Sequence, residues 1–172
     1  MNKCVIFLLM VFLAGCGYTT GSLLPSKYKT IYVEPFKNKI SYVSDSTRAL
    51  YIPLLESKAR EAIVDRFLFD GHLRIARSQQ ADLLLHGELT GFERQELRLT
   101  DNQEVQEYRI QITVALTMED LISGKTFWAE PSFTGEATYF TTGPQAKSES
   151  AALEEALTDL SRRAVARTIE DW

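Results

Sequence analysis

The feature that most constrains the fold is a strict alternation of apolar and polar residues in the middle of the chain. Apolar side chains occupy every second position from residue 108 to residue 118: Tyr108, Ile110, Ile112, Val114, Leu116 and Met118. Successive side chains of a β-strand point to opposite faces of the sheet. The pattern therefore predicts a long strand with one buried face and one polar face.

A second alternating stretch, residues 81–99, precedes this strand, and an Asp-Asn pair between the two stretches is typical of a turn. Leucines mark its apolar side: Leu83, Leu85, Leu89, Leu97 and Leu99. Gly87 and Gly91 fall on the same side, which predicts a bulge or a close backbone approach. The two stretches are expected to form a long antiparallel hairpin.

Two further segments have helical spacing of their apolar residues. One is predicted near residues 51–69, with Leu55, Ala59, Ala62, Ile63 and Phe67 on one face, and the other over residues 147–172, with Leu153, Leu157, Leu160, Ala164 and Ile169. Shorter strands are expected at residues 30–36, 73–76, 125–129 and 133–139. The order predicts an α+β, two-layer sandwich, a mostly antiparallel sheet of four to five strands covered on one face by two helices.

The N-terminus has the pattern of a targeting signal. Lys3 precedes an uninterrupted apolar run from Cys4 to Leu13, which is too short to span a bilayer as a helix and is typical of a secretory signal peptide. The run ends in Leu13-Ala14-Gly15-Cys16, which resembles the bacterial lipobox. A signal peptide at residues 1–15, a lipidated N-terminus and tether at 16–29 and a single domain at 30–172 are therefore expected.

Lipidation of Cys16 has chemical consequences for the rest of the chain. The thiol would carry diacylglycerol and the new α-amine a further acyl chain, and such anchors hold a protein stably on a membrane. The only other cysteine, Cys4, leaves with the signal peptide, so no thiol remains for a disulfide or a metal. By resemblance to the bacterial sorting rule, Gly17 rather than Asp after the lipidated residue favours the outer membrane.

Catalytic and metal-binding patterns do not emerge from the sequence. The chain has 19 Lys and Arg against 23 Asp and Glu, a net charge of −4, which excludes a broadly basic nucleic-acid binder. His72 and His86 lack the partner spacing of a helical metal site and are expected to be solvated. We expect no enzyme, no metal and no cofactor beyond the covalent lipid; a periplasmic hydrolase would need a nucleophile and a base that the sequence does not provide.

The polar face of the predicted sheet leaves two interpretations open. Its expected members are Glu88, Thr90, Arg94, Glu96, Arg98, Glu107, Arg109, Gln111, Thr113 and Thr117. The face is either wetted by solvent or docks against a polar partner, such as the hydrophilic lumen of an outer-membrane barrel. Arg94 and Arg98 approach one hairpin end and Lys125 another, where basic groups can pair with phosphates.

Taken together, these residues resemble the lipopolysaccharide-assembly lipoprotein (LptE-like) family. The matching elements are Cys16-Gly17-Tyr18, residues 31–38 (IYVEPFKN), Asp70-Gly71, Ala81-Asp82, residues 85–89 (LHGEL), Glu107-Tyr108-Arg109, Trp128 and a C-terminal helix ending at Trp172. The resemblance implies a lipoprotein that plugs a large outer-membrane β-barrel (LptD-like), assists its assembly and touches lipopolysaccharide during transport to the cell surface. It would face the periplasm or lie inside the barrel lumen.

The resemblance does not identify the lipopolysaccharide contacts. Arg94, Arg98 and Lys125 are predicted contacts from charge and placement alone. The strand at 30–36, the helix after it and the 81–89 segment also resemble the periplasmic domains of Tol-system proteins and curli-type secretion lipoproteins. A secretion-channel or envelope-scaffold lipoprotein is therefore the alternative.

Overall fold

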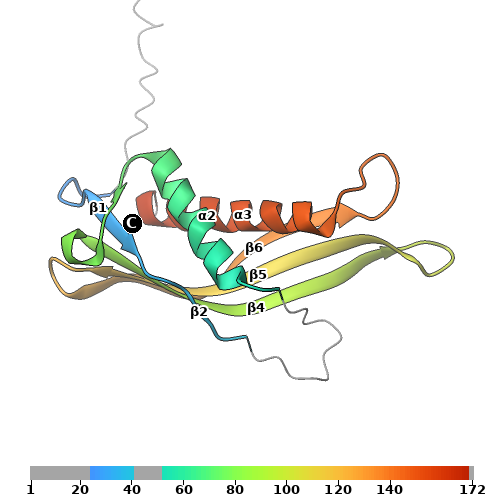
Figure 1. Cartoon of the computed structure of the whole chain (residues 1–172), viewed down its shortest axis with the longest axis horizontal. Helices are drawn as coiled ribbons and strands as arrows, with labels where there is room; N and C mark the ends of the chain where they lie inside the picture. The colour runs from blue at the N-terminus through green and yellow to red at the C-terminus, as the bar shows by residue number, and fades with distance from the viewer. Residues whose placement is uncertain (1–23, 41–51, 171–172) are drawn as a thin grey trace, which may run out of the picture.

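The computed structural model describes residues 24–40 and 52–170 of the 172-residue chain. The predicted signal peptide, the predicted lipidation site at Cys16, the expected helix start near Tyr51 and the C-terminal Trp172 lie outside these residues. The described residues form two layers, a sheet and a pair of helices on one of its faces, as Figure 1 shows. The predicted α+β sandwich is confirmed.

The sheet has six strands. They are β1 (Thr30–Val33), β2 (Lys37–Asn38), β3 (Arg74–Ile75), β4 (Leu83–Leu99), β5 (Val105–Asp120) and β6 (Lys125–Phe140). Their order is β3-β1-β4-β5-β6, and β2 lies beside β4. A 3₁₀ turn at Ser78–Gln80 and the helices α2 (Leu55–Asp70) and α3 (Glu149–Ile169) complete the elements.

The sheet is antiparallel through β4, β5 and β6 but parallel at its other side. β1 pairs in parallel with both β3 and β4, while β4 and β6 run antiparallel to β5. The parallel part follows from connectivity, because a chain that leaves β1 and crosses over through α2 returns to the sheet in the same direction. The sheet is thus mixed, and residues 37–38 add a further short parallel pairing with β4.

The two helices bury the faces that their spacing predicts. Leu55, Ala59, Ile63 and Phe67 of α2 are buried, and so are all five predicted residues of α3, Leu153, Leu157, Leu160, Ala164 and Ile169. Leu54 has a left-handed backbone (φ 59°), so α2 begins at Leu55 and Pro53 lies before it. The hydroxyl of Ser148 accepts a hydrogen bond from the backbone N–H of Ala151 at 3.2 Å and caps α3.

Two strand glycines allow close packing within the core. A Cβ at Gly135 of β6 would lie 2.5 Å from the carbonyl oxygen of Ala156 and 2.5 Å from Cβ of Leu160, both on α3. A Cβ at Gly87 of β4 would lie 2.3 Å from the ring of Phe36. Glycine therefore brings α3 directly onto the sheet at one site and seats an aromatic ring at the other. The close approach predicted at Gly87 is confirmed.

A β-bulge changes which residues of β4 face the helices. The register shifts between Leu89 and Gly91, and Phe92 beyond the shift is buried. Arg94 and Glu96 then lie opposite Ile110 and Tyr108, on the helix-facing side. Their predicted place on the polar face was wrong, because one extra residue reverses the alternation. A second shift returns Arg98 to the open face, opposite Glu107.

The two strands expected at residues 125–129 and 133–139 form a single strand, β6. Pro131 does not end the strand, because β6 is an edge strand and the register shifts between Val114 and Leu116 of β5, opposite the proline. A proline that donates no hydrogen bond is tolerated at such a place.

We call the end of the sheet where β4 begins and β5 meets β6 the base end. Two aspartates hold the incoming chain there. The Tyr28 hydroxyl donates to Asp120 at 2.7 Å, and Asp82 accepts from the backbone N–H of Lys29 and of Thr30 at 2.8 and 3.0 Å. We call the opposite end, where residues 100–104 join β4 to β5, the tip end; it extends beyond α3 (Figure 1).

Candidate functional site

Arg94 lies near the tip end and links β4 to the start of α3. Its Nη1 donates to Oε2 of Glu149 at 2.6 Å, its guanidinium lies 4.9 Å from the ring centroid of Tyr108, and the hydroxyl of Tyr139 donates to the same carboxylate at 3.2 Å. Burial disfavours the charged guanidinium, but the hydrogen bond and charge of Glu149 outweigh it and raise the pKa of Arg94. The side chain of Arg94 is thus held by contacts within the fold.

Tyr139 belongs to the same cluster, and its raised pKa shows that the cluster is shielded from water. Its ring stacks on that of Tyr108 with centroids 5.5 Å apart. Burial, followed by the charge of Glu149, raises the pKa of Tyr139 to about 12. The hydroxyl therefore remains a proton donor to Glu149 throughout the physiological range.

Arg98 lies nearer the tip and is more exposed. Its Nε is 3.7 Å from Glu107 and its side chain is 60% exposed, while its guanidinium lies 5.8 Å from the ring centroid of Phe140. It lines an open cavity of about 370 Å³ together with Gln106, Phe140 and residues 142–145. A guanidinium beside an aromatic ring in an open cavity can bind an anionic group such as a phosphate.

Lys125 is exposed at the base end, where it pairs in register with Asp120. Val105, at the other end of the 16-residue strand β5, pairs with Leu99 at the tip. At about 3.3 Å per residue, the 16 residues of β5 hold the two ends roughly 50 Å apart. The structure therefore brings Arg94 and Arg98 to one region and places Lys125 at the other end of the molecule.

The open face of the sheet carries a histidine between two carboxylates. His86 Nδ1 is 2.6 Å from Oε2 of Glu34 on one side, and its Nε2 is 3.5 Å from Oε2 of Glu119 on the other. A shallow cavity of about 290 Å³ surrounds these residues, with Lys37 and Glu88 also at its wall. The histidine was expected to be solvated; it is instead only partly exposed and lies between a carboxylate that follows β1 and one on β5.

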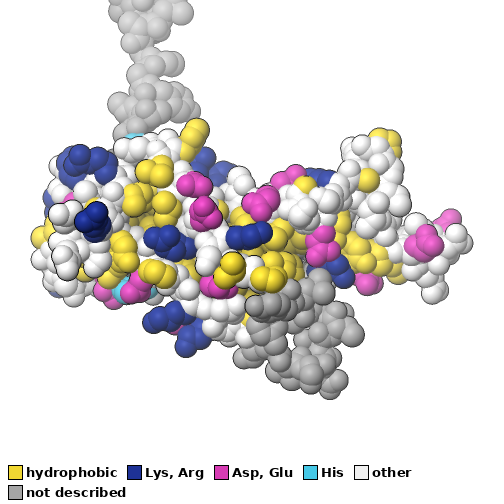
Figure 2. All heavy atoms as spheres, in the orientation of Figure 1, with side chains coloured by type: hydrophobic (Ala, Val, Ile, Leu, Met, Phe, Trp, Pro, Cys, Tyr) yellow, Lys and Arg dark blue, Asp and Glu magenta, His cyan; other side chains and the backbone are white. Residues whose placement is uncertain are grey.

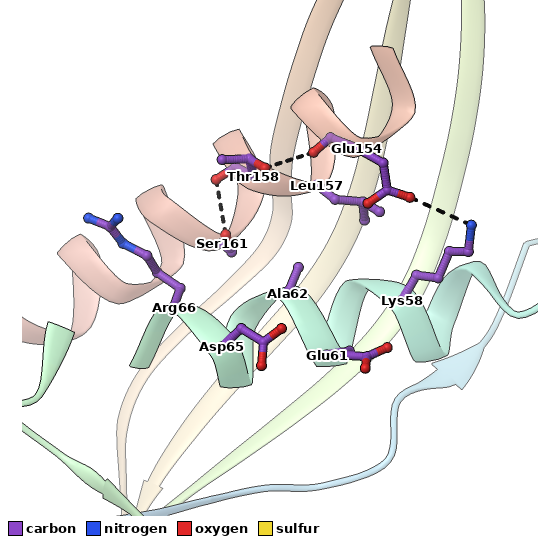
Figure 3. A pocket seen from close by; sticks show the side chains of 9 residues that line it. All are labelled: Lys58, Glu61, Ala62, Asp65, Arg66, Glu154, Leu157, Thr158 and Ser161. Carbon is purple, nitrogen blue, oxygen red and sulfur yellow. Dashed lines mark hydrogen bonds and ion pairs between the residues drawn. The ribbon is translucent and has the colours of Figure 1, made fainter. Parts of the chain in front are cut away.

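A further cavity of about 410 Å³ is a groove between α2 and α3. Figure 3 shows Ala62 and Leu157 at its floor and charged side chains along its rim. Lys58 lies 3.7 Å from Glu154 across the groove, and the hydroxyls of Thr158 and Ser161 donate to backbone carbonyls of their own helix. Both hydroxyls are thus hydrogen-bonded to the backbone of α3.

Within residues 24–40 and 52–170, no group of three or more His, Cys, Asp and Glu side chains is arranged to hold a metal ion. No helix in the same part of the chain is both long and apolar enough to cross a membrane.

Sequence reasoning missed the cluster around Arg94 and the one around His86. Glu34 reaches His86 because β1 lies parallel beside β4, and Glu149 reaches Arg94 because a bulge turns that arginine inward. Both contacts join residues more than fifty positions apart. The only local signals were the two glycines of β4, which marked where the strand departs from regular alternation.

Solved structures of other proteins share the fold. Protein XCC0632 from Xanthomonas campestris matches with a TM-score of 0.55 at 15% identity, over 81% of this chain and 83% of that one. The uncharacterized lipoprotein B from Nitrosomonas europaea matches with a TM-score of 0.52 at 12% identity, over 83% and 81%. At such identities the likeness establishes the fold.

A family model gives the more specific result. The model described as LptE, lipopolysaccharide-assembly, matches residues 28–169, and the chain belongs to this family. Among curated protein sequences, none matches the chain. Membership supports a lipoprotein with a role in lipopolysaccharide assembly and is consistent with a non-catalytic protein.

Proposed function

We propose that the chain is an outer-membrane lipoprotein, anchored through Cys16, that occupies the lumen of a large LptD-like β-barrel. In this role it assists assembly of the barrel and takes part in transport of lipopolysaccharide to the cell surface. The observation that carries the proposal is the family match over residues 28–169. The match favours this function over the secretion-channel or envelope-scaffold alternative.

The open face of the sheet supports the proposed place in a barrel. Opposite the helices, the central strand β5 presents Gln111, Thr113, Thr117 and Glu119, all of them partly exposed. The lumen of an outer-membrane barrel is polar, and hydroxyl and amide groups can exchange hydrogen bonds with such a wall. A face of this kind also keeps the protein soluble before it meets the barrel.

Within this proposal, the lipopolysaccharide contact at the tip end is Arg98. It combines exposure, an open cavity and an aromatic neighbour, Phe140, whereas Arg94 is held by Glu149 and positions α3 beside the cavity. A guanidinium can bind the phosphates of lipopolysaccharide through two parallel hydrogen bonds. Lys125 lies too far from this cavity to join the same contact.

Site-specific photo-crosslinking tests this contact. A photoreactive side chain in place of Thr142, which lines the cavity, is expected to crosslink to lipopolysaccharide in living cells, and Arg98→Ala is expected to reduce the yield. The matched control places the same group at Arg162 on α3, an exposed residue paired with Asp159. Equal yields from positions 142 and 162, or a yield at 142 that Arg98→Ala leaves unchanged, would contradict the proposed contact.

A further inference from the structure

The turn between β5 and β6, at the base end, exposes two large apolar side chains. Leu121 is 41% and Ile122 58% exposed. The turn is held in shape by Asp120, whose Oδ1 accepts from the backbone N–H groups of Ile122 and Ser123 at 2.8 and 3.2 Å and whose Oδ2 accepts from the hydroxyl of Ser123. The apolar pair is thus presented by an ordered turn and has no place in the core.

Basic residues surround this turn in a chain that is acidic as a whole. Lys27, Lys29, Arg74 and Lys125 are exposed at the base end, and Figure 2 shows Lys and Arg side chains gathered at the end of the molecule where β1 lies. Within the described part of the chain, no carboxylate forms an ion pair with Lys29, Arg74 or Lys125.

Of these four basic residues, Lys27 pairs with a carboxylate of the base end, and the two aspartates there leave the other three charges without an ion pair among the described residues. Asp82 is occupied by the segment at residues 29–30, and the backbone N–H of Lys29, more than any other group, lowers its pKa. Asp120 lies beneath the surface, accepts from Tyr28 and Ser123 and pairs with Lys27 at 3.6 Å. The outer surface of the base end is thus apolar at its centre and cationic around it. Surfaces of this composition are typical of proteins that lie in a lipid headgroup layer.

The chain enters the fold at the same end. Seven residues separate Cys16 from Leu24, the first described residue. Eight steps of at most 3.6 Å each reach no farther than about 29 Å. A lipid on Cys16 would therefore keep the base end close to the membrane while the tip end, about 50 Å away along β5, points away from it.

We propose that the base end is a membrane-contact surface. Leu121 and Ile122 enter the interface of the phospholipid leaflet, while Lys29, Arg74 and Lys125 bind the phosphates of anionic phospholipids. The inference rests on the proposed function in one respect, since it uses a lipid anchor on Cys16. Its consequence is orientation: the contact holds the sheet upright, so that the tip end with Arg98 is directed into the barrel and away from the leaflet.

Fluorescent labelling at one position tests the contact. The mature lipidated chain has no other thiol, so Ile122→Cys can be labelled with an NBD group, and Leu99→Cys at the tip is the matched control. In vesicles of phosphatidylethanolamine and phosphatidylglycerol, the label at 122 is expected to shift to the blue and to resist reduction by aqueous dithionite, whereas the label at 99 is reduced rapidly. Equal rates at the two positions would overturn the proposal.

The charge requirement has its own control. Lys29→Gln with Lys125→Gln is expected to weaken the contact at 122 on the order of fivefold per lysine removed. Lys37→Gln with Lys39→Gln removes the same charge from β2 and the residue after it and is expected to leave the contact unchanged. Equal effects of both pairs would show that net charge, and not this surface, governs the approach.

The anchor is measured separately by mass spectrometry of the N-terminal peptide. An unacylated peptide would contradict the lipoprotein part of the proposed function. In that case the labelling is repeated with Cys16→Ser, so that position 122 alone is labelled; protection with excess vesicles would still support the contact surface, and full exposure would overturn it. Acylated protein with full exposure at 122 would overturn the contact surface alone.

Discussion

At the scale of single residues, Gly135 sets how closely α3 packs on the sheet. An added Cβ would meet the backbone of α3 at 2.5 to 2.6 Å, and backbone cannot move aside as a flexible side chain can. We expect Gly135→Ala to lower the free energy of unfolding by about 1–3 kcal/mol, the usual cost of overpacking. Urea denaturation monitored by circular dichroism measures it.

Gly91 provides the matched control for this substitution. It also lies in a strand, but a Cβ there would meet only the side chain of Thr113, at 3.3 Å on the open face. Gly91→Ala is expected to change stability by less than about 1 kcal/mol, because relief of backbone entropy offsets the tight contact. Equal losses at 91 and 135 would show that the contact with α3 is not the cause.

Asp120 makes stability depend on pH. Hydrogen bonds from the Ser123 hydroxyl and, against the effect of burial, from Tyr28 and two backbone N–H groups hold the pKa of Asp120 well below its usual value. A depressed pKa in the folded state stabilises the protein above the unfolded-state pKa near 3.9, and this stabilisation is lost as the pH falls toward the folded-state pKa.

We therefore expect Asp120→Asn to lower the melting temperature at pH 7 and the difference from the parent protein to shrink below about pH 4. Thermal unfolding followed across pH 3 to 7 measures both. Asp101→Asn, at the exposed tip turn, serves as the control and should show no such difference. A difference in melting temperature that stays constant down to pH 3 would show that ionised Asp120 is not the source of this stabilisation.

At the scale of elements, the ion pair between Arg94 and Glu149 fastens β4 to the first turn of α3. A double-mutant cycle with Arg94→Met and Glu149→Gln is expected to give a coupling energy of about 0.5–2 kcal/mol, because the hydrogen bond is short and both partners are half-buried. The exposed pair of Lys58 and Glu154 should give only about 0.2–0.5 kcal/mol. The same coupling for both pairs would argue against a structural role for Arg94.

The elements differ in how well the sequence predicts them. Strands β4 and β5 and both helices follow from periodicity, because burial of one face imposes a regular spacing on the apolar residues. The inward turn of Arg94 could not be predicted, since a bulge reverses the alternation and its position depends on the pairing with β5. The contact of His86 with Glu34 likewise depends on the parallel pairing of β1 with β4, which no local pattern specifies.

At the scale of the whole molecule, the two ends of the long sheet differ in chemistry. The base end combines exposed apolar residues with lysines and arginine around the point where the chain enters the fold, while the tip end carries Arg98 beside an open cavity. Between them the sheet presents one polar face and buries the other under two helices (Figure 1). We infer that this difference between the two ends orients the protein between a membrane surface and the barrel lumen.

Occupancy of a large outer-membrane barrel can be tested by affinity isolation of the tagged chain from detergent-solubilised outer membrane. We expect recovery of a large β-barrel in a one-to-one ratio with the chain, and reduced surface lipopolysaccharide after depletion of the chain. Recovery of the chain alone or as a ring of its own copies, with normal surface lipopolysaccharide after depletion, would contradict it.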